Sequence, residues 1–214
     1  MKKFSVTTFS IFTCGIFILT LGVSLTIISD LGASPFDALL VGLSQNVGLT
    51  VGSWEVLIAC LLIGCNSCLS KQRPELLGLV TAFIAGIGID MWLFLLNNLI
   101  EPNLWISKIA FYGLGLIAIG LGTSIYLYAN FAPIPVDRLT LVLQTITRLS
   151  ILFTRTIIYL VFLFAAIIFN EPIGIGTLLT ICLGGLILNY FMPLIQKALD
   201  RLLQHTTADS AKEI

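Results

Sequence analysis

Long apolar runs constrain this chain more than any other feature of its sequence. A helix needs about 20 apolar residues to cross a hydrocarbon core of about 30 Å. Hydrophobic residues make up 57% of the chain and charged residues only 10%, with a mean hydropathy of +1.05, which excludes an ordinary soluble domain. We therefore expect an all-α, multi-pass membrane protein. Six runs of spanning length lie near residues 8–29, 51–70, 75–99, 104–129, 151–170 and 173–196.

The two halves of the chain resemble each other at an offset of 100 residues. Residues 21–24 (Leu-Gly-Val-Ser) align with residues 121–124 (Leu-Gly-Thr-Ser) without gaps. Residues 30–37 align in the same way with residues 130–137, and each of these two blocks contains a Pro-x-Asp element. Matches of Gly, Pro and Asp are informative in so apolar a sequence, so we interpret the halves as internal repeats.

Each repeat reads as a long helix, a short Pro-x-Asp segment and two further helices. The short segments, 35–47 and 135–148, are about 20 Å long at 1.5 Å per residue, so we interpret them as half-helices that do not span. Three spans per repeat would invert the second copy relative to the first. We predict one membrane domain, 1–214, with repeats at about 8–99 and 104–197 and a polar cytoplasmic tail at 198–214.

The distribution of basic residues supports six spans over eight. With both termini in the cytoplasm, only Lys108 among the assigned cations falls outside, in agreement with the positive-inside tendency. If both half-helices crossed, Lys71 and Arg73 would also lie outside. The residues then assigned to the cytoplasmic side are Lys2, Lys3, Lys71, Arg73, Arg138, Arg148, Arg155, Lys197, Arg201 and Lys212.

The Pro-x-Asp elements have a structural and a functional interpretation. Ser34 is a natural N-cap, Pro35 suits the first helical position, and Asp37 suits the third, so helix capping alone explains the first copy. Pro135 and Asp137 repeat the arrangement without the capping serine. However, carboxylates in a bilayer are costly and usually mark a cavity or an ion path, and paired half-helices are typical of inverted-repeat transporters. Both interpretations stay open.

Other charged residues extend the set of cavity candidates. Asp90 lies well inside the third run, where no local cap exists, and is the best single candidate for an intramembrane carboxylate. Glu55 aligns with Arg155, so corresponding positions carry opposite charges. We expect Arg155 to pair with Asp137, which would leave Asp37 beside Glu55 to be balanced by a proton or a bound cation. Arg138, next to Asp137, completes the set.

Small residues and missing motifs limit the remaining functions. We expect glycines to allow close helix packing. The five cysteines lie in apolar runs, and we expect them to be reduced and buried, without a metal. The chain lacks H-E-x-x-H, a Ser/His/Asp set and a nucleotide fingerprint, so we expect no enzyme activity, no cofactor and no nucleic-acid partner. The packing glycines are Gly22, Gly122, Gly174, Gly176 and Gly184.

Several of these blocks resemble a known family. Residues 30–39 and 48–54 resemble a block of the bacterial YczE/YyaS/YitT family of integral membrane proteins, closest to the YczE branch. Residues 135–139 and 174–177 resemble later blocks of the same family, and the resemblance extends over about residues 10–195. It implies a protein of the bacterial cytoplasmic membrane, and it implies no substrate.

Two functions remain as alternatives. The first is a transporter-like protein for a small solute, coupled to protons through Asp37, Asp90 or Asp137. The second is a membrane-embedded accessory or regulatory protein that acts through protein contacts at its glycine-rich faces. In either case the lipid bilayer surrounds the chain. Because six spans are few for a monomeric carrier, a homodimer or another membrane-protein partner is expected.

Overall fold

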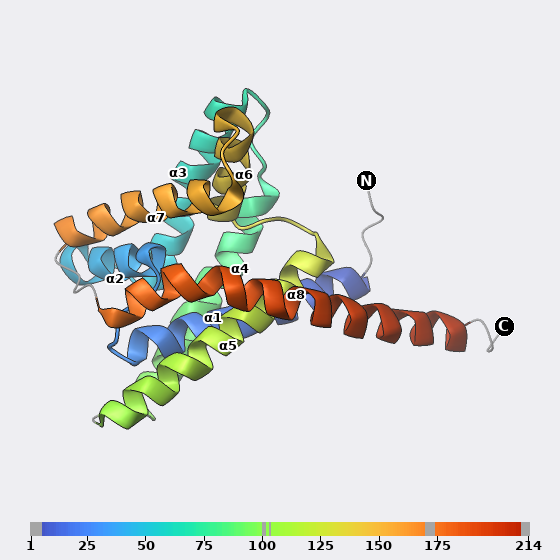
Figure 1. Ribbon diagram of the computed structural model, residues 1–214, viewed down its shortest axis with the longest axis horizontal. Coiled ribbons are helices and arrows are strands. Elements are labelled where there is room, and N and C mark those ends of the chain that lie inside the picture. The colour runs from blue at the N-terminus through green and yellow to red at the C-terminus, as the bar shows by residue number, and fades with distance from the viewer. Residues whose placement is uncertain (1–5, 100–101, 103, 170–173, 211–214) are drawn as a thin grey trace.

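The described part of the chain is entirely helical. The structure is a computed structural model that describes residues 6–99, 102, 104–169 and 174–210 (Figure 1). The predicted all-α fold is confirmed for these residues. They form eight helices: α1 (Val6–Ile28), α2 (Pro35–Val47), α3 (Val51–Ser70), α4 (Leu77–Asn97), α5 (Trp105–Ala129), α6 (Pro135–Thr147), α7 (Ile151–Ile168) and α8 (Ile175–Ser210).

Five of these helices, α1, α3, α4, α5 and α8, are long and apolar enough to cross a membrane. The sixth predicted span corresponds to α7, an apolar helix of 18 residues whose described part, Phe153–Ile168, is shorter than these five helices. Helices α2 and α6 have 13 residues each, or about 20 Å, which is too short for a hydrocarbon core of about 30 Å. Helix α8 continues to Ser210, so the predicted tail begins as part of a helix.

The central helix pair is α1 with α5, which run antiparallel. Lys108 near the start of α5 forms an ion pair with Asp30 beyond the end of α1 (2.7 Å), and Phe12 near the start of α1 packs on Tyr126 near the end of α5. The helices approach closely because glycines face each other. A Cβ on Gly22 would lie 2.7 Å from the Gly115 carbonyl oxygen. Without side chains at these positions, the backbones pack directly.

The glycine contacts between α1 and α5 are reciprocal. Gly22 faces Gly115, and Gly122 lies 2.7 Å from the Gly15 carbonyl oxygen, measured from a Cβ built on Gly122. At the offset of 100 residues, Gly15 corresponds to Gly115 and Gly22 to Gly122. The contact between Gly22 and Gly115 therefore corresponds to the contact between Gly122 and Gly15, as in the isologous contacts of a two-fold interface.

The short helices pack against the opposite half of the chain. Helix α2 contacts α7 and α3, and α6 contacts α3 and α7, so these four helices form a closed ring. Figure 1 shows α2 beside α7, α3 beside α6, and α8 along α5. Helices α4 and α8 flank the central pair, α4 against α1 and α8 against α5. Helix α3 packs extensively along α4, whereas α7 meets α8 at only a few positions.

Besides Gly22, three of the predicted packing glycines lie at tight backbone contacts, and the remaining one does not. Gly122 lies against α1, while Gly174 and Gly176 press the start of α8 onto residues 31–32, where the Gly176 amide donates to the Leu31 carbonyl (2.7 Å). The prediction for Gly184 was wrong, because a Cβ there would meet nothing within 4 Å. The described contacts between α7 and α8 are too sparse to require a small residue.

The prediction of buried cysteines was also wrong. All five cysteines are free, and each is exposed on the outer surface of its helix. Apolar composition alone does not distinguish a helix face that packs on protein from one that faces lipid, because both favour small, weakly polar side chains.

Candidate functional site

Buried and half-buried polar side chains from five helices form one electrostatic unit. The charges of Asp37 and Asp137 both act on Glu55, and the charge of Arg155 acts on Asp137. Asp37 and Glu55 are only 7% and 4% exposed. We call this group the carboxyl cluster, and it consists of Asp37 (α2), Glu55 (α3), Tyr126 (α5), Asp137 (α6), Arg155 and Tyr159 (both α7).

Asp37 enters the cluster through the cap of α2. Ser34 is the N-cap, and its hydroxyl oxygen accepts from the Asp37 amide (3.2 Å) and donates to the Asp37 carboxylate (2.6 Å). Pro35 occupies the first helical turn, so the predicted capping arrangement is confirmed. This bond and the field of the helix N-terminus both stabilise a carboxylate. Capping therefore explains how Asp37 is buried, and it leaves the neighbouring carboxyls unexplained.

Asp137 is held differently from its counterpart. Ile134 replaces the capping serine and has no side-chain hydrogen bond to α6, so the Asp137 carboxylate instead accepts a hydrogen bond from the Tyr126 hydroxyl of α5. Arg155 does not form the expected ion pair with Asp137. It donates to the Tyr159 hydroxyl (2.9 and 3.1 Å), one turn further along α7, and its charge acts on Asp137 from beyond contact distance.

Glu55 is the least satisfied member of the carboxyl cluster. It lies one turn inside α3, and within the described residues its carboxyl forms no hydrogen bond or ion pair. Two other carboxyls act on it electrostatically. An isolated buried carboxylate costs several kcal/mol, and two neighbours of the same sign raise that cost. Asp37, which the sequence predicts beside Glu55, acts on it electrostatically, and Asp137 acts on it as a third participant.

Asp90 lies outside the carboxyl cluster and has a capping function. Its carboxylate accepts from the Thr50 hydroxyl (2.6 Å) and from the Gly52 amide (2.8 Å) at the start of α3. The sequence offered Asp90 no local cap, and the helix that its carboxylate caps is the distant α3 rather than its own α4. Gly52 and Gly86 bring the two backbones together at this crossing.

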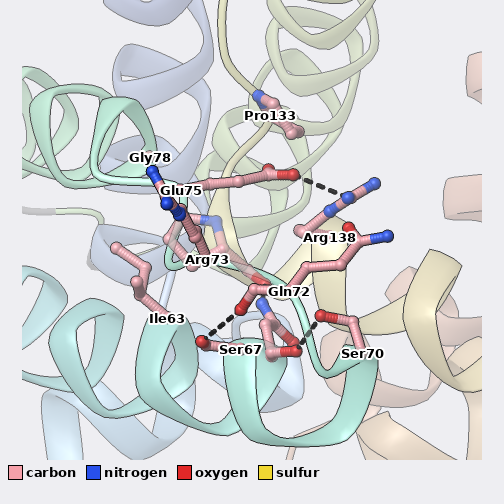
Figure 2. Close-up of a pocket in the computed structure, with 11 residues that line it drawn as sticks. Ile63, Ser67, Ser70, Gln72, Arg73, Glu75, Gly78, Pro133 and Arg138 are labelled. Atoms are coloured by element: carbon pink, nitrogen blue, oxygen red, sulfur yellow. Dashed lines mark hydrogen bonds and ion pairs between the residues drawn. The ribbon is translucent and has the colours of Figure 1, made fainter.

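Arg138 and Pro135 lie at a separate pocket beside the start of α6. Arg138 forms an ion pair with Glu75 of the α3–α4 connection (2.6 Å), which Figure 2 shows among the residues that line the pocket. The Pro135 carbonyl accepts a hydrogen bond from the side-chain amide of Asn66 (3.0 Å). The candidates from the sequence therefore separate into the carboxyl cluster, the cap of α3 and this pocket.

Several residues of these sites were missed at the level of sequence. Tyr126 and Tyr159 are aromatic residues in apolar runs, and nothing local marks them as partners of charged groups. Asn66 carried a usable signal, because it lies eleven residues, about three helical turns, after Glu55 and therefore on the same face of α3. The offset of 100 residues also predicts the Gly15 and Gly115 pair, which the comparison of the two halves overlooked.

Comparisons with known proteins place this architecture in a family. The family described as "Family of unknown function (DUF6198)" matches residues 6–193. The chain is 59% identical to "Uncharacterized protein YyaS" of Bacillus subtilis (strain 168) over 183 residues, covering 86% of this chain and 91% of that protein. It is 36% identical to "Uncharacterized membrane protein YczE" of the same strain over 194 residues, covering 90% and 89%.

A third relative is more distant. It is an uncharacterized protein of Haemophilus influenzae (strain ATCC 51907 / DSM 11121 / KW20 / Rd), 25% identical over 191 residues, which cover 89% of this chain and 85% of that protein. No solved structure matches the chain significantly. With five candidate spans and a relative described as a membrane protein, the chain is a multi-pass membrane protein that belongs to the DUF6198 family.

Proposed function

We propose that this chain is a small-solute transporter built from two inverted repeats, in which the carboxyl cluster carries a coupling proton or monovalent cation. The observation that carries the proposal is the charge of the cluster. Three carboxylates lie near one guanidinium, which leaves two negative charges in a site where Asp37 and Glu55 are buried and Asp137 and Arg155 half-buried. The N-termini of α2 and α6 each contribute about half a positive charge. About one negative charge remains to be balanced.

Protein groups within the described residues do not supply that balance. Asp37 and Asp137 receive hydroxyl hydrogen bonds, and Arg155 is directed to Tyr159, while Glu55 receives nothing. Leaving one buried charge uncompensated costs several kcal/mol, so a proton or a bound cation completes the site. Intramembrane carboxyls that bind and release such an ion are characteristic of ion-coupled transporters.

The packing of the two halves supports an inverted repeat. Helices α1 and α5 occupy corresponding places in the sequence, and they run antiparallel with reciprocal glycine contacts. Each short helix packs on the long helix that follows the other short helix, α2 on α7 and α6 on α3. Transporters of this kind bind their ions and substrates where the repeats meet, and the carboxyl cluster draws on both repeats.

Sidedness tests the inverted topology directly. In a cysteine-free background, single cysteines are placed at four exposed positions, Asp30, Gln72, Asn98 and Asn130, and intact cells are treated with a membrane-impermeant thiol reagent. We expect labelling at 30 and 98 in intact cells, and at 72 and 130 only after permeabilisation. Because Asp30 and Asn130 are repeat counterparts, labelling of both from the same side would exclude inversion.

Transport is tested in proteoliposomes that contain a pH indicator. The small-molecule fraction of a bacterial extract is added outside, and we expect a change of internal pH with the wild-type chain. Glu55→Gln and Asp37→Asn should slow this change at least about tenfold while elution volume and abundance stay constant. Asp200→Asn, at an exposed carboxyl, is the control. No flux with any fraction, or full flux in Glu55→Gln, would refute proton coupling.

A sodium arm separates the two coupling ions. If the cluster holds Na⁺ rather than a proton, solute entry should depend on external Na⁺ and disappear when choline replaces it. Internal pH would then stay constant during entry. Either result retains the role of Glu55, because both ions balance the same charge.

A second function is favoured by the lipid-facing surface of the second half. Only 6% of the apolar window of α8 is buried, against 33% in the corresponding α4, and α7 barely contacts α8. These faces would suit an accessory protein that packs on a membrane-protein partner or on a second copy. Such a protein should tolerate Asp37→Asn and lose function through substitutions at packing glycines, which is the reverse of the pattern expected for a transporter.

A further inference from the structure

Glu55 is the member of the carboxyl cluster whose negative charge the protein stabilises least. Its side chain is 4% exposed, and it forms no hydrogen bond or ion pair within the described residues. It lies beyond the first turn of α3, and the field of a helix N-terminus falls off within that turn. A carboxylate in such a place is costly, whereas a neutral carboxylic acid is tolerated.

The helices that pack on α3 add to this cost. They are α2, α4 and α6, and α3 itself carries no other acidic or basic residue. Helix α2 contributes Asp37 and α6 contributes Asp137, and the charges of both act on Glu55. The other charge of α6, Arg138, is used in its ion pair, and the carboxylate of α4, Asp90, caps α3. Glu55 therefore faces two negative charges and no uncompensated positive charge from these three helices.

The two aspartates, in contrast, are held as anions. Asp37 accepts a hydrogen bond from the Ser34 hydroxyl (2.6 Å), and Asp137 accepts one from the Tyr126 hydroxyl. Each aspartate also lies in the first turn of its short helix, where the helix dipole favours a negative charge. A donor directed at a carboxylate stabilises its ionised form. Of the three carboxyls, only Glu55 lacks both kinds of stabilisation.

The charges of the cluster balance when Glu55 is neutral. Arg155 and the two helix N-termini then contribute about two positive charges, which match the two carboxylates of Asp37 and Asp137. With Glu55 ionised, about one negative charge is left over. The charge balance requires one neutral carboxyl, and the hydrogen bonds decide which of the three it is.

The cluster suits a proton better than a metal cation. Hard cations are bound by several oxygen atoms that converge on one point. Among the described residues, no three His, Cys, Asp or Glu side chains lie close enough to hold a metal ion. In transporters, backbone carbonyls bind sodium where a helix is unwound, but Glu55 lies within the regular helix α3. A proton needs only one oxygen atom, which Glu55 provides.

We infer that the ion held by the carboxyl cluster is a proton, bound to a side-chain oxygen of Glu55. The proton comes from water as an O–H bond forms on the carboxylate, and it returns to water when that bond breaks, so no further reactant is needed. This inference names the coupling ion of the proposed transporter, and it rests on that proposal only for the step from binding to transport.

Infrared spectroscopy of the full chain, at neutral pH in a detergent without ester groups, measures the protonation state directly. A protonated carboxyl absorbs at a carbonyl frequency separate from those of carboxylates and of the amide backbone. We expect one such band in the wild type. It should shift when the side-chain carboxyls of glutamate are isotopically labelled, and stay in place when those of aspartate are labelled. In heavy water the band should shift as the proton exchanges.

Two variants and a change of salt complete the test. Glu55→Gln should remove the band, and because glutamine is a neutral group of nearly the same shape, this variant is expected to fold. Asp200→Asn, at an exposed carboxyl, should retain the band. Replacing choline chloride by sodium chloride should change neither the band nor the unfolding temperature. Isotope labelling uses the wild type, so it tests the assignment even if Glu55→Gln does not fold.

The outcomes separate this inference from the transport proposal. Absence of the band, a shift on aspartate labelling, or no shift in heavy water would overturn the inference, even if proteoliposomes show flux. Loss of the band in sodium chloride would overturn the choice of a proton over sodium and leave ion-coupled transport in place. A glutamate band that Glu55→Gln removes, without flux in proteoliposomes, would uphold the proton on Glu55 and count against transport.

Discussion

Replacing Gly22 by alanine tests whether the backbone contact between α1 and α5 is needed for stability. A Cβ at this position would lie 2.6 Å from the Ile119 amide nitrogen and 2.7 Å from the Gly115 carbonyl oxygen, both backbone atoms that cannot rotate away. Ordinary contact begins at 3.4 Å, so the helices must separate by about 1 Å. Overpacking of this size costs about 1–3 kcal/mol.

Gly113→Ala is the matched control on the same helix pair. Its Cβ would meet nothing within 4 Å, and alanine in a helix is favoured over glycine by about 0.5–1 kcal/mol, so this variant should be neutral or slightly stabilised. The two variants should therefore differ by about 2–3 kcal/mol in the free energy of unfolding. For a chain of this length that corresponds to about 4–12 °C in Tm.

The assay is thermal unfolding of the full chain in detergent. Unfolding is measured as the decrease, with rising temperature, in the fraction of soluble protein that elutes at the volume of the native protein. A double variant, Gly22→Ala with Gly115→Ala, should cost less than the sum of the two single changes, because one separation of the helices relieves both clashes. Equal Tm values for Gly22→Ala and Gly113→Ala would show that the close approach of α1 and α5 does not stabilise the fold.

Three further substitutions probe individual hydrogen bonds and ion pairs by the same assay. Asp90→Ala should destabilise the chain by about 2 kcal/mol, because Thr50 and Gly52 lose their acceptor, and Asp90→Asn should recover at least half of this; a neutral alanine variant would contradict the capping function. Tyr126→Phe should cost about 1–3 kcal/mol, since the Asp137 carboxylate loses a buried donor, whereas Tyr128→Phe, at an exposed bond to Asp200 (2.5 Å), should cost under about 1 kcal/mol. Lys108→Ala should change the free energy of unfolding by less than about 1 kcal/mol in low or high salt, because the side chain of its partner Asp30 is 73% exposed. A larger loss of stability would contradict the small contribution expected of an exposed ion pair.

Local features were predictable from the sequence where their causes are local. The boundaries of α2 agree with the predicted segment 35–47, and those of α6 agree within one residue, because Pro35 and Pro135 fix the starts and a polar turn follows each helix. The cap of α2 was predictable for the same reason, since Ser34 and Asp37 are three residues apart.

Contacts between distant segments were less predictable. Asp90 caps a helix that begins about 40 residues earlier in the chain, and Asp137 receives its hydrogen bond from another helix, so neither partner can be read from spacing. The error at Gly184 has a related cause, because a glycine shows that a close approach is permitted without showing that a neighbour is there. Repeat correspondence remains the best guide to such contacts, as the reciprocal glycines of α1 and α5 illustrate.

The different attachments of the two aspartates affect how each would respond to motion. Asp37 is bound to Ser34 at the start of its own helix, so any rigid displacement of α2 carries the donor and acceptor together. Asp137 is bound to Tyr126 of the central pair, so a displacement of α6 away from α5 stretches that bond and exposes a carboxylate without its donor. Asp37 therefore keeps its hydrogen bond when α2 moves, whereas Asp137 loses its hydrogen bond when α6 moves away from α5. Although the two halves are alike in sequence, movement of the short helix changes the hydrogen bonding of the aspartate only in the second half.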